Sequence, residues 1–155
     1  MSADDTGNDE QRRGKSVTVV EMTTPLLRSV DAVTFHVSDL DEGIAFYVEH
    51  LGHALLWRNN NIGAAGIALP ESSTEIVLTT QQQYEPNWLV HSVDAAAAVF
   101  EAAGGRVVAP AVDIPVGRVA VVEDPFGNVL VLIDLSKGRF TTDEHGNVTA
   151  IVADP

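Results

Sequence analysis

Few side chains in this sequence are of a type that could do chemistry inside a binding site. The 155 residues include five histidines and no cysteine, which excludes thiolate nucleophiles, thiolate metal sites and disulfides. His36 follows an alternating apolar run and could act as a general acid or base, or contact a ligand. Glu75 could share a face of the fold with it. A His36–Glu75 pair would be a poor metal site, because two ligands leave most of the coordination shell unfilled.

Two tryptophans and one arginine are the other candidates for ligand contact. Trp57 and Trp88 lie in predicted strands, where an indole ring can stack on an apolar or aromatic molecule. A plugged cavity is the alternative role for Trp88. Arg118 begins a predicted strand and could bind an anionic or carbonyl group at the mouth of a site. Alternatively, it pairs with a carboxylate such as Asp113.

The overall charge narrows the classes of partner. The formal net charge is −13 at pH 7, with 45% hydrophobic and 20% charged residues. Such a composition indicates a folded globular protein, and its negative charge disfavours nucleic acid and anionic membrane surfaces. Neither a signal-peptide pattern nor an 18-residue apolar run occurs, so a cytoplasmic protein is expected. A cationic ligand would be favoured electrostatically.

The pattern of apolar residues predicts the same order of elements twice. In each half a strand is followed by a helix and then by three more strands, and each helix opens at an aspartate, Asp39 or Asp94. Residues 1–29 are predicted to be a flexible acidic extension, and residues 136–155 a C-terminal hairpin and tail. The predicted strands are 30–37, 53–58, 62–69 and 74–80 in the first half, and 87–93, 106–112, 118–123 and 128–134 in the second.

The segments VSDLDEGIAFYVEHLG and VGRVAVVEDPFGNVLVLID, placed in these two βαβββ modules, resemble the vicinal oxygen chelate superfamily. This superfamily includes glyoxalase I, bleomycin-resistance proteins and extradiol dioxygenases. The likeness covers residues 30–135, with module one at 30–80 and module two at 87–135. It implies an α+β fold, in which the modules form a half-open eight-stranded mixed barrel with helices outside and a ligand cavity inside.

The resemblance also implies where a metal ion would bind. Metal-dependent members carry His and Glu at four positions facing the cavity centre, and these fall here on non-ligating residues: Ala32, Val77, Trp88 and Val131. No metal and no cofactor is therefore expected.

We accordingly expect a metal-free protein that binds a small apolar, aromatic or cationic molecule through His36, Trp57, Trp88 and Arg118, with sequestration of such a compound as one use. One alternative is a metal-independent lyase or isomerase with His36 as the acid or base and Arg118 stabilising negative charge. Another is an accessory protein whose cavity is filled by Trp88. The resemblance also implies a homodimer.

Overall fold

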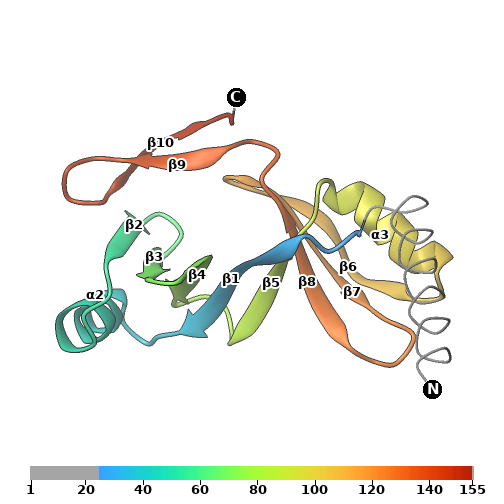
Figure 1. Ribbon diagram of the computed structural model, residues 1–155, viewed down its shortest axis with the longest axis horizontal. Helices are drawn as coiled ribbons and strands as arrows, with labels where there is room; N and C mark the ends of the chain where they lie inside the picture. Colours follow the sequence, from blue (N-terminus) through green and yellow to red (C-terminus); the bar gives the residue numbers. More distant parts are fainter. Residues whose placement is uncertain (1–24, 155) are drawn as a thin grey trace, which may run out of the picture.

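The computed structural model describes residues 25–154 and contains two repeats of the predicted element order (Figure 1). The first repeat comprises β1 (Ser29–His36), α2 (Leu40–Ile44), the π-helical segment η1 (Ala45–His50), β2 (Leu55–Asn59), β3 (Ala64–Leu69) and β4 (Ser72–Thr79). The second comprises β5 (Glu85–Leu89), α3 (Val93–Ala102), β6 (Arg106–Ile114), β7 (Gly117–Glu123) and β8 (Val129–Asp134). A hairpin of β9 (Arg139–Thr142) and β10 (Val148–Val152) follows. These elements confirm the α+β fold.

The sheet joins the two repeats through their first strands. Its order is β2-β3-β4-β1-β5-β8-β7-β6, so β2 and β6 are the two edges and are not paired with each other. Within each repeat the first and last strands run parallel, whereas β1 and β5 pair antiparallel at the centre. The sheet therefore has the half-open form that the sequence predicts, with α2 and α3 on its outside (Figure 1).

Each helix begins where a side chain caps it. Asp39 has an extended backbone and its carboxylate accepts a hydrogen bond from the Glu42 N–H at 2.9 Å, as predicted. The prediction for the second helix is wrong by two residues. Ser92 is the N-cap, accepting from the Ala95 N–H at 3.2 Å, and Asp94 lies within the first turn. There its negative charge is favoured by the helix dipole.

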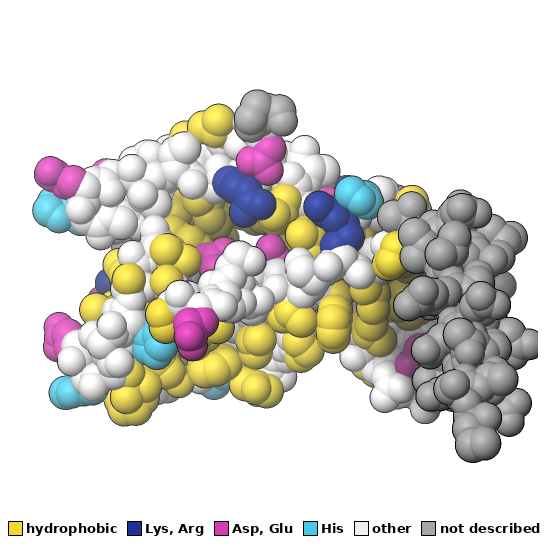
Figure 2. Space-filling view, in the orientation of Figure 1, with side chains coloured by type: hydrophobic (Ala, Val, Ile, Leu, Met, Phe, Trp, Pro, Cys, Tyr) yellow, Lys and Arg dark blue, Asp and Glu magenta, His cyan; other side chains and the backbone are white. Residues whose placement is uncertain are grey.

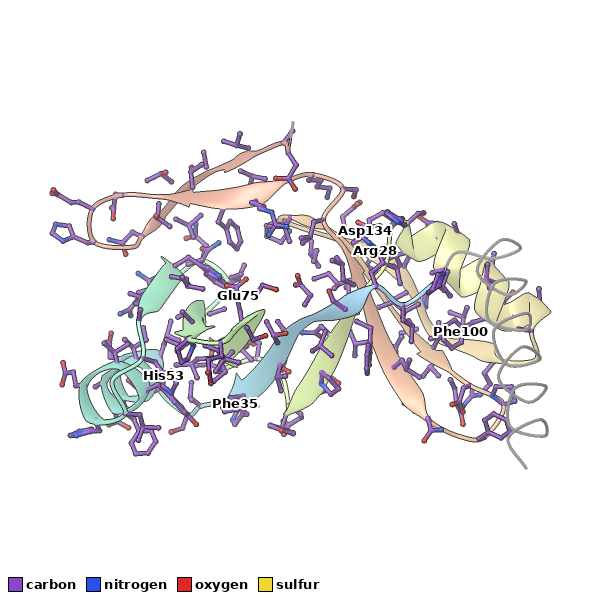
Figure 3. All side chains as sticks on the ribbon, in the orientation of Figure 1. Arg28, Phe35, His53, Glu75, Phe100 and Asp134 are labelled. Atoms are coloured by element: carbon purple, nitrogen blue, oxygen red, sulfur yellow. The ribbon has the colours of Figure 1, made fainter. Side chains whose placement is uncertain are left out.

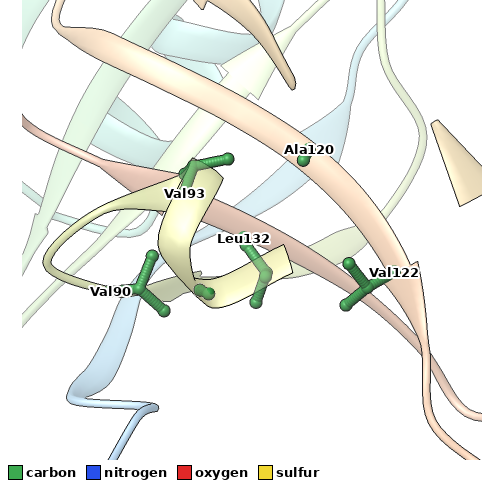
Figure 4. Packing of buried hydrophobic residues seen from close by; sticks show 6 residues of the cluster. Val90, Val93, Ala120, Val122 and Leu132 are labelled. Carbon is green, nitrogen blue, oxygen red and sulfur yellow. The ribbon is translucent and has the colours of Figure 1, made fainter. Parts of the chain in front are cut away.

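Two separate clusters of apolar side chains form the core, one under the helices of each repeat. In the second repeat, α3 packs on the outer face of β7 and β8 (Figure 4), with Val90, Val93, Ala96, Ala120, Val122 and Leu132 at its centre. In the first repeat the cluster consists of Leu40, Ala65, Ile67, Ile76 and Leu78. Because both clusters lie outside the curled sheet, the inner face is left for a cavity.

The C-terminal hairpin forms as predicted and lies across β2. Its turn is organised by Asp143, whose carboxylate accepts hydrogen bonds from the backbone of His145 and Asn147. The Arg58 N–H donates to the Gly146 carbonyl at 2.8 Å, which attaches the hairpin to the edge of the sheet. The hairpin therefore covers part of the edge strand β2.

Most of the predicted N-terminal extension, residues 1–24, lies outside the described residues, and β1 begins at Ser29 within its last part. Among the residues that the structure describes, no helix combines the length and apolar character needed to cross a membrane.

Asp134, at the end of β8, connects the strands of the second repeat to its helix. It is only 3% exposed, and its carboxylate accepts hydrogen bonds from the backbone N–H groups of Val93, Arg118 and Ser136 and from the Ser136 hydroxyl. Burial alone would raise the pKa of Asp134, but these hydrogen bonds together outweigh it and lower the pKa below 3.8. The Asp134 carboxylate therefore has a structural role.

We predict that Asp134→Asn lowers the free energy of unfolding by about 2–4 kcal/mol, because an amide NH₂ group would face backbone N–H donors. Urea denaturation at pH 7 measures this loss. Since the folded-state pKa is lowered, the contribution of Asp134 is complete only well above the ordinary pKa of an aspartate, falls as the pH drops through that value, and is lost below the folded-state pKa. Glu101→Gln, an exposed change on α3, should alter the free energy by less than about 0.5 kcal/mol. Equal stability of the two variants at pH 7 would contradict this role.

Candidate functional site

Strands of both repeats and the C-terminal hairpin enclose a cavity of about 610 Å³. Figure 2 shows the hollow beneath the hairpin, with acidic side chains inside it. Most of the cavity wall is apolar. The apolar wall residues include Leu56, Ile62, Val119, Val121, Ile133 and Leu135. A cavity of this size and character matches the usual binding sites of small organic molecules.

Trp57 on β2 forms the aromatic side of the cavity, as the sequence predicts. Its indole ring lies 4.9 Å from the ring of Phe140 on β9, measured between centroids, at an interplanar angle of 53°. The indole Nε1–H donates a hydrogen bond of 2.7 Å to Oε1 of Glu75. The Trp57 ring is therefore fixed on one side by the hairpin and on the other by a carboxylate of β4.

Gly66 on β3 makes room for this arrangement, and sequence reasoning missed it. A Cβ atom at this position would overlap the Trp57 indole and lie 2.6 Å from Glu75 Oε1. Gly66 is the Cα partner of both Trp57 on β2 and Val77 on β4. The absence of a side chain here lets the indole lie across β3 and reach Glu75.

Three carboxylates line the cavity: Asp31, Glu75 and Glu85. Burial raises the pKa of each of them above its ordinary value. For Glu75, repulsion from Asp31 adds to this rise, whereas the Trp57 hydrogen bond and the Arg139 charge oppose it. Asp31 reaches the cavity because the pairing of β1 with β5 shifts register between Val30 and Ala32. Side-chain alternation alone would direct Asp31 away from the Ala32 face.

Arg139 on β9 is the basic residue of the described wall. It lowers the pKa of Asp31 and Glu75 by Coulomb attraction, but less than burial raises them. The Arg139 Nε atom also lies 3.3 Å from Oδ2 of Asp154, beyond β10. The Arg139 guanidinium therefore interacts both with the cavity carboxylates and with Asp154 at the C-terminal end of the hairpin.

No protein-family model matches the sequence, and no curated protein matches it. Solved structures do match. A methylmalonyl-CoA epimerase from Mycobacterium tuberculosis is 24% identical, with a TM-score of 0.58 over 73% of this chain and 91% of that one. A hypothetical protein from Bacillus halodurans is 14% identical, with a TM-score of 0.56 over 74% and 98%. A Streptomyces coelicolor methylmalonyl-CoA epimerase in complex with 2-nitronate-propionyl-CoA is 20% identical, with a TM-score of 0.53 over 70% and 94%.

The chain has the vicinal oxygen chelate fold. At these identities the likeness establishes the architecture, and the chemistry must be argued from the residues themselves.

Three of the four metal positions expected for a vicinal oxygen chelate protein lie where the sequence predicts. Ala32, Val77 and Val131 all line the cavity, and none can ligate a metal. The fourth assignment, Trp88, is wrong. Thr34 on β1 pairs with Val77 on β4, and Asn87 on β5 pairs with Val131 on β8, so the repeats superpose Thr34 on Asn87 and hence Ala32 on Glu85.

Trp88 instead packs against the core cluster of the second repeat and is not part of the cavity wall. The error comes from treating Asp94 as the first residue of the second helix, which shifts the alignment of the two repeats. Aligning the true N-caps, Asp39 and Ser92, would have placed Glu85 at the fourth position from sequence alone. With one carboxylate and three aliphatic side chains, these four positions do not fit a metal ion.

His36 and Arg118 are also absent from the cavity wall. His36 lies at the exposed end of β1, where its Nδ1 atom is 3.0 Å from the Gln82 carbonyl oxygen. The displaced His36–Glu75 metal pair therefore does not form, and within residues 25–154 no group of three or more potential His or carboxylate metal ligands occurs.

Arg118 contacts Asp94 and Asp113 at 2.9 and 3.0 Å, the pairing that its acidic surroundings favour. Proton transfer in the cavity would consequently fall to its carboxylates.

We predict that Gly66→Ala displaces the Trp57 indole and costs about 1–3 kcal/mol of stability, because the new methyl group and the indole would occupy the same space. The matched test is a double-mutant cycle with Trp57→Ala, followed by thermal or urea denaturation. Removing the indole should relieve the clash, giving a favourable coupling of at least about 1 kcal/mol. Additive effects of the two substitutions would show that the indole does not lie over Gly66.

Proposed function

We propose that this protein binds a small, largely apolar or aromatic molecule in the cavity and needs no metal to do so. The observation that carries the proposal is the enclosed apolar volume with the Trp57–Phe140 pair on its wall. Aromatic rings and aliphatic side chains give binding energy by excluding water, and a few polar groups orient the ligand. Sequestration of a drug-like compound would need only these properties.

The residue types at the metal positions support a binding role over metal-assisted catalysis. Ala32, Val77 and Val131 offer no ligand atom, whereas their positions in a metal-dependent protein of this fold would hold one each. The alternative of a lyase or isomerase required His36 as the acid or base, but His36 lies outside the cavity wall.

The matched epimerases suggest an acyl-CoA as a second ligand class, because one of them was solved with methylmalonyl-CoA. The charge of the present cavity disfavours it. A CoA thioester carries several negative charges, and the described wall presents three carboxylates against one arginine. A neutral or cationic molecule is the better match.

We further propose that the protein forms a homodimer, as the fold implies, and acts as a soluble cytoplasmic protein. Native mass spectrometry of gently purified protein would report the subunit number and any small molecule that remains bound.

Nile red, a neutral apolar dye, provides a direct test of binding. We expect its fluorescence to rise on titration into the protein, and Trp57→Ala to weaken binding by about tenfold or more, because the dye loses an aromatic contact. Trp88→Phe is the matched control. It should leave the dissociation constant within about twofold, since Trp88 lies in the core and not on the wall.

The stability of both variants should be measured alongside binding. Trp88→Phe is expected to lower the free energy of unfolding, because it removes part of a packed side chain. Equal losses of affinity in the two variants, or no binding of apolar dye by the wild type, would contradict the proposed site.

A further inference from the structure

The cavity has an uncompensated negative charge. Its charged wall residues are Asp31, Glu75, Glu85 and Arg139, and the arginine is shared with Asp154, which lies outside the wall. Carboxylates removed from water are costly unless a positive group or hydrogen-bond donors replace the lost hydration. Among the residues that the structure describes, the partners of these carboxylates fall short of this requirement.

Asp31 and Glu75 are neighbours within this wall and repel each other. Glu75 is the Cα partner of Ala32 across β1 and β4, and Asp31 is the next residue along β1. The Trp57 hydrogen bond fixes one oxygen of Glu75 and leaves the other available. Figure 3 shows Glu75 at the space enclosed by the two halves of the sheet and the hairpin. An ammonium group placed here would meet two carboxylates.

Asn87 adds an uncharged polar group to the same wall. It is only 9% exposed and lines the cavity. A side-chain amide carries both hydrogen-bond donors and an acceptor, so it can meet a polar group of a ligand. Asn87 is the Cα partner of Ala32 on the opposite side from Glu75, so β1 separates the amide from that carboxylate.

We propose that the ligand of this cavity is an aromatic or apolar amine, bound with its ammonium group between Asp31 and Glu75 and with a polar group at Asn87. This inference rests on the proposed function, since it assigns a chemical class to the molecule in the same cavity. The apolar body lies against Trp57 and Phe140.

The carboxylates make such binding depend on pH. Their pKa values are raised by burial, so part of the negative charge is neutralised as the pH falls towards those values. Arg139 on β9 opposes this shift at both groups, and Glu85 on β5 titrates in the same direction. Because an ammonium ion requires ionised partners, its affinity should fall as the pH is lowered, whereas that of a neutral ligand should not.

Three probes of similar shape test the proposal: 1-naphthylmethylamine, 1-methylnaphthalene and 1-naphthoate. Each is titrated into the full chain at pH 7.5 with calorimetry as the readout. We expect the amine to bind at least about tenfold more tightly than the neutral compound, and the carboxylate to bind most weakly. Glu75→Gln should remove most of the amine preference, with Asp31→Asn as a second, independent variant. Glu144→Gln, on the exposed tip of the hairpin, is the matched control and should change nothing.

The outcomes separate this inference from the proposed function. Binding of the neutral and cationic probes with equal affinity, or a preference that survives both Glu75→Gln and Asp31→Asn in folded protein, would overturn the amine assignment and leave apolar binding in place. Failure of all three probes, together with Nile red, would instead overturn the binding function itself. Loss of the preference at low pH, with unchanged binding of 1-methylnaphthalene, supports the assignment of the carboxylates.

Discussion

The antiparallel pairing of β1 with β5 is the constraint on which the rest of the structure depends. It joins two repeats that each have their own helix and their own apolar cluster, and it brings their inner faces together around one cavity. Its register decides which side chains face inward. Ala32 opposite Asn87, and Thr34 opposite Glu85, place four side chains on the cavity side, whereas Trp88 is directed into the core of the second repeat. A shift of one residue would exchange these two sets.

The same strand pair explains why the cavity is acidic. A local shift in register after Val30 brings Asp31 to the inner side, beside Ala32, where alternation would allow only one of the two. Gly66 contributes from the neighbouring strands by letting the Trp57 indole cross β3 to Glu75. Two local features, the register shift beside Asp31 and the missing side chain at Gly66, thus shape the acidic part of the cavity wall.

The regular part of the molecule could be predicted from sequence, and these departures could not. Apolar periodicity and turn residues gave both repeats, the strands and the C-terminal hairpin, because these elements follow from local patterns. Trp57 was a candidate because it lies in a predicted strand, where an indole ring can line a cavity, and it does line the cavity. Trp88 was misplaced because two aspartates looked like equivalent helix caps, and the second cap is in fact Ser92. His36 and Arg118 were candidates because of their side-chain chemistry. His36 lies at the exposed end of β1, and Arg118 pairs with nearby carboxylates, so neither reaches the cavity. Asp31, Gly66 and Asn87 carry no local signal, since their roles arise only when distant strands pair.

One buried and one half-buried carboxylate of this protein, Asp134 and Glu75, differ in how completely their hydrogen bonding is satisfied. Asp134 accepts hydrogen bonds from three backbone N–H groups and a hydroxyl, and its pKa is lowered although burial acts in the opposite direction. Glu75 receives one hydrogen bond, from Trp57, has Asp31 for a neighbour, and has a raised pKa. Within residues 25–154, the fold thus provides hydrogen-bond donors for both oxygens of Asp134, but for only one oxygen of Glu75. In the proposed complex, the ammonium group of the ligand would supply the positive charge that Glu75 lacks among the described residues. The incomplete pairing of Glu75 is therefore the physical reason for proposing a cationic ligand in this cavity.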